Sequence, residues 1–99
     1  MKINDLSTLF GSRGKSKILQ ILLEEEEINI SALLKRTQIA YPLVIRYLSE
    51  LEENGLVMQK RFGKIRIISL VNSKSTRILK NFLREWKNSE EENIGKGYG

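Results

Sequence analysis

The chain has 99 residues, of which 40% are hydrophobic and 29% are charged, and its formal net charge is +5. This length suits one small domain, is short for an enzyme with its own substrate cleft, and includes no apolar run that could span a membrane. Cysteine and histidine are both absent, which excludes disulfides and removes the usual ligands of zinc and copper and the commonest general base. We therefore expect a protein that is not an enzyme and that needs no metal or cofactor. Residues 1–5 lack the basic-then-apolar layout of a signal peptide, so we expect a cytoplasmic location.

The chain begins with two predicted helices and a very short strand. A helical lead-in over residues 3–11 is interrupted by Gly11, and Ser12 is placed to cap a helix that runs to about Glu26. Residues 28–30 then alternate like a short strand. The apolar face of the lead-in consists of Ile3, Leu6, Leu9 and Phe10. The buried face of the second helix is predicted at Ile18, Leu19 and Leu22, with Ile21 or Leu23 beside them.

A short helix, a turn and a longer helix follow. Ser31 is predicted to cap a brief helix over residues 32–36, and residues 37–40 form the turn. Pro42 suits the first turn of a longer helix over residues 41–54, because its missing N–H costs nothing there. Asn-Gly is a typical end for that helix. The inward side chains are predicted to be Leu33 and Leu34 on the brief helix and Val44, Leu48 and Leu51 on the longer one.

The second half of the chain changes from helical to strand periodicity. Residues 56–61 and 65–71 are predicted as two strands joined by a hairpin tip at 62–64. Asn72 or Ser73 caps a last helix that runs to about Lys87. The expected fold class is mainly α with a small β-hairpin (α+β), in the order α-α-β-α-α-β-β-α. The expected organisation is a lead-in over 1–11, a principal domain over 12–72, a C-terminal helix over 73–88 and a disordered tail over 89–99.

The sequence contains two partial matches to enzyme motifs, and both lack required features. Residues 11–16, GSRGKS, are similar to a phosphate-binding loop, but that motif has four residues between its glycines and follows a buried strand. Residues 9–14, LFGSRG, are similar to minimal nucleotidyltransferases, yet the paired acidic residues that would hold metal ions do not follow. Neither motif therefore supports an enzyme.

The stretch over residues 28–57, INISALLKRTQIAYPLVIRYLSELEENGLV, resembles the helix-turn-helix of the MarR and ArsR regulator families. The resemblance lies in the short helix, the turn, the apolar spacing of the longer helix and the closing LEENGLV before a basic hairpin. With its flanks it covers about residues 12–71. It implies a winged helix-turn-helix fold and a DNA-binding transcriptional regulator that takes double-stranded DNA as its partner.

The longer helix, residues 41–54, is the candidate recognition helix. A major groove admits one α-helix, which presents side chains from its N-terminal half to base edges. Arg46 is the only cation on this helix, and arginine is the commonest bidentate partner of guanine. Ile45 is expected between the outer and the buried face. The residues predicted to contact DNA are Tyr41, Pro42, Leu43, Ile45, Arg46 and Tyr47.

The hairpin over residues 59–66, here called the wing, is the most basic part of the chain. Its cations have no acid between them, and in the resembling families such a hairpin lies along the DNA backbone or the minor groove. The expected backbone contacts are Lys60, Arg61, Lys64 and Arg66, together with Lys35 and Arg36 at the end of the preceding short helix.

The last helix carries a broad apolar stripe with cations on its opposite side. In dimeric winged-helix regulators the terminal helices pair across a two-fold axis, and the resemblance therefore implies a homodimer and a palindromic site. The stripe could instead pack back on its own domain. Its residues, the predicted dimer interface, are Ile78, Leu79, Phe82, Leu83 and Trp86.

Three alternatives stay open at this stage. The outer face of the recognition helix is rather apolar, so a protein-interaction module or a non-specific architectural DNA-binding protein competes with a sequence-specific regulator. The cations Arg13, Lys15 and Lys17 at the start of their helix oppose the helix dipole. They either bind phosphate or belong to a charged surface without a ligand. The identity of any small-molecule effector does not follow from the residues, and no membrane contact is expected.

Overall fold

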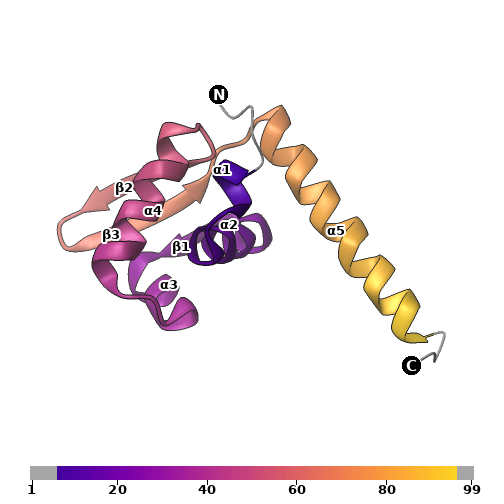
Figure 1. Cartoon of the computed structure of the whole chain (residues 1–99). Helices are drawn as coiled ribbons and strands as arrows, with labels where there is room; N and C mark the ends of the chain where they lie inside the picture. Colours follow the sequence, from indigo (N-terminus) through magenta and orange to yellow (C-terminus); the bar gives the residue numbers. More distant parts are fainter. Residues whose placement is uncertain (1–6, 96–99) are drawn as a thin grey trace.

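The structure is a computed structural model and describes residues 7–95. The elements in this range follow the predicted order α-α-β-α-α-β-β-α, which is confirmed (Figure 1). Ile3 and Leu6 of the predicted lead-in lie outside the described residues. The elements are α1 (Ser7–Phe10), α2 (Arg13–Glu25), β1 (Glu27–Asn29), α3 (Ile30–Thr37), α4 (Tyr41–Glu53), β2 (Val57–Phe62), β3 (Ile65–Leu70) and α5 (Lys74–Gly95).

The core lies where α2, α3 and α4 meet the sheet. The predicted inward faces of α2 and α4 are confirmed, since their residues are buried. They lie together because apolar residues three and four apart share one side of a helix. On α3, Leu33 is fully buried, whereas Leu34 is half-buried and packs against the core. The side chains with no exposed surface at the centre are Ile18, Leu22, Leu33, Val44, Leu48, Leu51, Leu56 and Ile68.

The sheet has three antiparallel strands in the order β1-β3-β2. The hairpin register pairs Val57 with Leu70 at its root and Phe62 with Ile65 at its tip. Gly63, the first of the two turn residues, has a φ of 61°, as a tight hairpin turn that places glycine at this position requires. The predicted and observed bounds of these two strands therefore differ by one residue at most.

The boundary between β1 and α3 differs from the prediction. Asn29, rather than Ser31, caps α3: its Oδ1 accepts a hydrogen bond of 2.7 Å from the Ser31 backbone N–H. The helix begins at Ile30, which leaves Ser31 inside its first turn. Both residue types are good caps, and the outcome depends on pairing, because β1 ends where Asn29 meets Ile67 of β3.

The other helix ends follow their sequence signals. The Ser12 hydroxyl accepts a hydrogen bond of 3.2 Å from the Lys15 backbone N–H, so Ser12 caps α2 as predicted. The end of α4 is formed by Asn54 and by Gly55, whose φ of 75° favours glycine.

An ion pair joins the start of α2 to the end of α4. Lys15 Nζ lies 2.8 Å from Glu50 Oε1, and the Lys15 side chain is only 11% exposed. Lys15 therefore packs its aliphatic stem between the helices while its ammonium group is neutralised by Glu50. Lys15 is one of the cations that oppose the α2 dipole, and this pair supplies a tertiary reason for its position.

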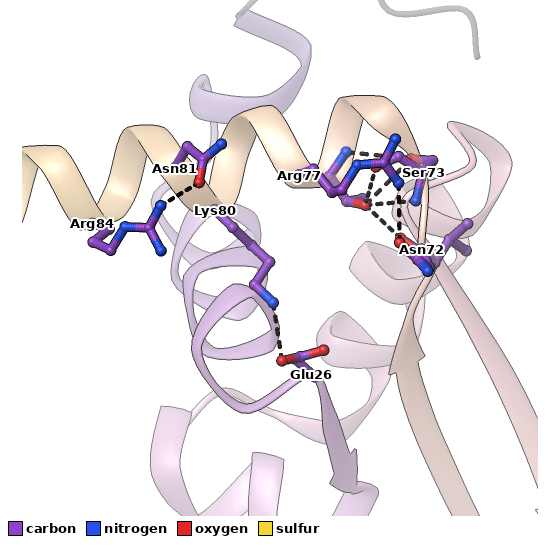
Figure 2. Close-up of polar contacts among 9 residues, drawn as sticks. Glu26, Asn72, Ser73, Arg77, Lys80, Asn81 and Arg84 are labelled. Atoms are coloured by element: carbon purple, nitrogen blue, oxygen red, sulfur yellow. Dashed lines mark hydrogen bonds and ion pairs between the residues drawn. The ribbon is translucent and has the colours of Figure 1, made fainter.

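The start of α5 is fixed by hydrogen bonds from two residues (Figure 2). Thr76 N–H donates to the Ser73 hydroxyl and Ser73 N–H donates to Thr76 Oγ1, which is the reciprocal arrangement of a capping box. The Thr76 hydroxyl also donates to the Val71 carbonyl at 2.5 Å, and Thr76 is 1% exposed. Ser73 is thus the cap of the last helix, one of the two predicted residues.

The last helix is longer than predicted. It runs to Gly95 instead of ending near Lys87, so the prediction of disorder from residue 89 is wrong for residues 89–95. The stretch from Ser89 to Glu92 is rich in glutamate, a good helix former, and no glycine or proline precedes Gly95 to stop the helix. On the way, Lys80 pairs with Glu26 at 2.9 Å (Figure 2) and Lys87 pairs with Glu24, which ties α5 to the end of α2.

We predict that Glu50→Gln lowers the free energy of unfolding by about 1–2 kcal/mol, because the nearly buried Lys15 ammonium group loses the one carboxylate that it pairs with among the described residues. Urea denaturation measures this loss. The matched control is Glu53→Gln on the same helix, since Glu53 is exposed and has no ion pair with another described residue. An equal effect of both substitutions would show that the pair contributes nothing beyond the surface charge of α4.

We predict that Thr76→Val, which keeps the shape of the side chain, lowers the free energy of unfolding by about 1–3 kcal/mol. The substitution removes one half of the capping box and leaves the Val71 carbonyl without its hydroxyl donor. Thermal denaturation followed by circular dichroism measures the change. Ser75→Ala, at the neighbouring helical position, serves as the control, and a Thr76→Val variant as stable as this control would contradict the role of the hydroxyl.

Candidate nucleic-acid interface

The first two turns of α4 present the predicted DNA-facing residues unevenly. Tyr41 is 51% exposed, Pro42 is exposed, and the Arg46 side chain is 65% exposed. Leu43 is half-buried. On the opposite face of the helix Val44, Leu48 and Leu51 are fully buried. The side chains that face away from the core are therefore Tyr41, Pro42, Leu43 and Arg46.

Tyr47 differs from the expectation that it lies on or near the outer surface, whereas Ile45, expected between the two faces, lies there. Both are half-buried and pack against the core. The Tyr47 ring fills the space beside Gly14 of α2, where an added Cβ would lie 2.7 Å from the ring. The spacing contains this signal, because Tyr47 is three residues after Val44 and four before Leu51 and thus borders the buried face.

Arg46 is held by its neighbours on the same helix. Its Nε lies 3.9 Å from Glu50 Oε2, and its guanidinium carbon lies 5.5 Å from the centre of the Tyr47 ring. Because Glu50 also binds Lys15, the three charged residues form a chain from α2 to the exposed face of α4. Glu50 was not predicted as part of the site, although the spacing of four residues between Arg46 and Glu50 places the two side chains on one face of the helix.

The cations before the turn have different surroundings. Arg36 Nη1 lies 2.7 Å from Glu25 Oε2, so this guanidinium group is already paired with the acidic end of α2. Lys35 is exposed and has no ion pair with any other described residue. Of the two predicted backbone contacts on α3, Lys35 is therefore the one that is free to meet a phosphate.

The wing concentrates unpaired positive charge. Lys60, Arg61 and Lys64 are exposed and Arg66 is half-buried, and none of the four forms an ion pair with a carboxylate in the part of the chain that the structure describes. Arg61 lies directly opposite Arg66 in the hairpin register. Like charges at such a pair destabilise a sheet, so the fold itself does not explain them. A polyanion would neutralise them.

The wing and the last helix lie at opposite ends of the molecule, and the hairpin tip extends past α4 (Figure 1). The predicted dimer residues of α5 divide into two sets. Leu79 and Leu83 are half-buried and pack against the core. Ile78, Phe82 and Trp86 are 55–59% exposed, and the Phe82 and Trp86 rings stack with their centres 6.3 Å apart.

No group of three or more acidic side chains that could hold a metal ion is present among the described residues. In the same range, no helix is both long enough and apolar enough to cross a membrane.

Known proteins similar to this chain share its fold. Residues 15–58 match a family described as winged helix-turn-helix DNA-binding. A search of proteins with curated functions finds no similar sequence. Three similar solved structures are those of HlyU from Vibrio cholerae, NolR from Sinorhizobium fredii and FabT from Streptococcus pneumoniae, the last in complex with DNA.

The structural similarity extends over most of the chain. HlyU is 20% identical with a TM-score of 0.70 and covers 82% of this chain and 86% of its own. NolR is 25% identical with a TM-score of 0.65, over 81% and 77%. FabT is 18% identical with a TM-score of 0.72, over 94% and 70%. Residues 15–58 thus match the winged helix-turn-helix DNA-binding family, and the chain shares its fold with solved transcriptional regulators of the ArsR- and MarR-like type.

Proposed function

We propose that this chain is a transcriptional regulator that binds a palindromic DNA site as a homodimer, with α4 in the major groove and the wing on the backbone or in the minor groove. The observation that carries the proposal is the unpaired positive charge of the wing, above all the facing pair Arg61 and Arg66. Lysine and arginine side chains at a duplex release condensed counterions, which favours binding. Lys35 extends the same charge to the end of α3.

Base recognition is assigned to the start of α4. Tyr41, Pro42 and Arg46 are its exposed side chains, and Arg46 can form two hydrogen bonds with the O6 and N7 atoms of guanine. In the free protein Glu50 lies within ion-pair distance of Arg46. Any partner of Arg46 must compete with Glu50, whose negative charge repels a phosphate more strongly than an uncharged base, so this pair favours a base contact over a non-specific contact with phosphate.

The exposed face of α5 supports self-association. Ile78, Phe82 and Trp86 form one apolar stripe, while their neighbours Leu79 and Leu83 hold the helix on its own domain. A second copy that buries the same stripe gives a two-fold interface, in which each helix covers its equivalent. Two recognition helices related in this way would meet half-sites about 34 Å apart, one turn of DNA.

We expect Arg46→Ala to reduce the preference for the selected site over unrelated duplexes by about ten- to a hundredfold, because one bidentate base contact is lost. Lys64→Ala should weaken binding to all duplexes alike and should lower the slope of log affinity against log salt concentration by about one. Selection from random DNA followed by fluorescence anisotropy at several salt concentrations measures both effects.

Arg84→Ala is the control for these two variants, since Arg84 is exposed on α5 and its side chain contacts Asn81. It should bind DNA as the unchanged protein does. Equal affinity for every duplex, unaltered by Arg46→Ala, would reject sequence-specific recognition and favour the architectural alternative. Absence of duplex binding at low salt would reject DNA binding altogether, because counterion release makes such binding tightest there.

We expect Trp86→Ala to weaken self-association by at least about tenfold, because a large exposed aromatic side chain in a small interface supplies much of its binding free energy. Sedimentation equilibrium at several concentrations should give twice the chain mass of 11.5 kDa for the unchanged protein. The control, Glu85→Ala, removes an exposed side chain at the next position and should leave the mass unchanged. A monomer at all concentrations would contradict the homodimer.

A further inference from the structure

The tip of the wing carries an exposed apolar pair that the fold does not use. Phe62 and Ile65 are cross-strand partners next to the turn, and they are 62% and 51% exposed. Directly opposite residues in an antiparallel pair point to the same side. The two side chains therefore form one apolar surface at the end of the hairpin, beyond the part of the sheet that the helices cover.

Strand alternation gives the wing two different sides. Val57 and Ile68 are buried and define the side that faces the helices, and Arg61 and Arg66 continue that side toward the tip. Phe62, Ile65 and Lys60 lie on the other side. The apolar pair thus has unpaired cations behind it, beside it and, at Lys64, in the turn itself.

This combination fits a nucleic-acid groove better than an apolar protein surface. A groove of duplex DNA offers stacked bases between two rows of phosphates, so apolar and cationic groups are both satisfied there. The minor groove is about 6 Å wide, which excludes a helix and suits a two-residue turn. Phenylalanine and isoleucine are among the side chains that proteins insert between base steps from that side.

We propose that Phe62 and Ile65 form a wedge that enters the minor groove, partly unstacks one base step and bends the duplex. The inference rests on the proposed DNA binding and adds a mode of recognition to it. A wedge reads how easily a step unstacks, so it favours flexible pyrimidine–purine steps such as TA without a hydrogen bond to any base. The cations Lys60 and Lys64 then lie near the phosphates on either side of the opened step.

The test measures DNA bending by energy transfer between dyes at the two ends of a short duplex. Two duplexes are compared, one with a central TA step and one in which that region contains no pyrimidine–purine step. The unchanged protein should bend the first by about 20–90° and bind it more tightly than the second. The double variant Phe62→Ser, Ile65→Thr should lose more than half of the bend and about tenfold in affinity for the TA duplex. Its salt dependence should stay unchanged, because no cation is removed.

Met58→Ser is the matched control, since Met58 is 41% exposed on the same side of the hairpin but four residues further from the tip. It should bend and bind DNA as the unchanged protein does. All three substituted residues are exposed, so the variants should unfold at the same temperature as the unchanged protein, which rules out a loss of structure as the cause.

The outcomes separate the wedge from the DNA binding on which it rests. Duplex binding without a change in energy transfer, or an equal bend with the double variant, overturns the wedge and leaves the proposed function intact. Absence of duplex binding at low salt overturns both. If the double variant bends DNA normally but loses binding to phosphatidylserine vesicles, the tip binds a membrane surface and the wedge is overturned.

Discussion

The packing of α2 is the constraint on which the other elements depend. Ile18, Leu19 and Leu22 are at most 1% exposed. Their helix, α2, contacts every other described helix and the strands β1 and β3. Because protein interiors are close-packed, this helix fixes how α4 and the root of the wing lie relative to each other. The pair of Lys15 and Glu50 fixes the last turn of α4 to α2, while Tyr41 and Pro42 at the opposite end of α4 are exposed.

The charges of α2 oppose its helix dipole at both ends, and tertiary contacts compensate for this. The cost of such charges is a few tenths to about 1 kcal/mol each when they are exposed. Lys15 at the positive end has a carboxylate from α4, and glutamates at the negative end have cations from α3 and α5. A helix that looks unfavourable by itself is therefore a junction between elements. The pairs at its negative end are Glu25 with Arg36, Glu26 with Lys80 and Glu24 with Lys87.

Much of the fold follows from residue spacing, because the buried side of a helix and the period of a strand are local properties. The order of elements, the Ser12 cap and the buried face of α4 could be predicted in this way. The start of α3 could not, since the choice between Asn29 and Ser31 depends on where β1 stops pairing with β3. Nor could the Lys15–Glu50 pair, whose members are 35 positions apart in sequence. In the candidate site, the exposed Arg46 and the basic wing were predictable, whereas the inward packing of Tyr47 depends on the space left by Gly14.

The capping box of Ser73 and Thr76 has a mechanical consequence. It lies where the chain passes from the sheet to the last helix. β3 ends at Leu70, three residues before Ser73, and α5 continues for 22 residues, a length of about 33 Å. Over that length a change of about 5° in the direction of the helix would move its far end by about 3 Å, so the pairs of Lys80 and Lys87 with α2 are needed to hold the direction that the capping box sets. In the proposed dimer such a displacement would change the distance between the two copies of α4. The hydrogen bonds at the start of α5 and the ion pairs along it would thus together set the spacing of half-sites that the proposed dimer can match.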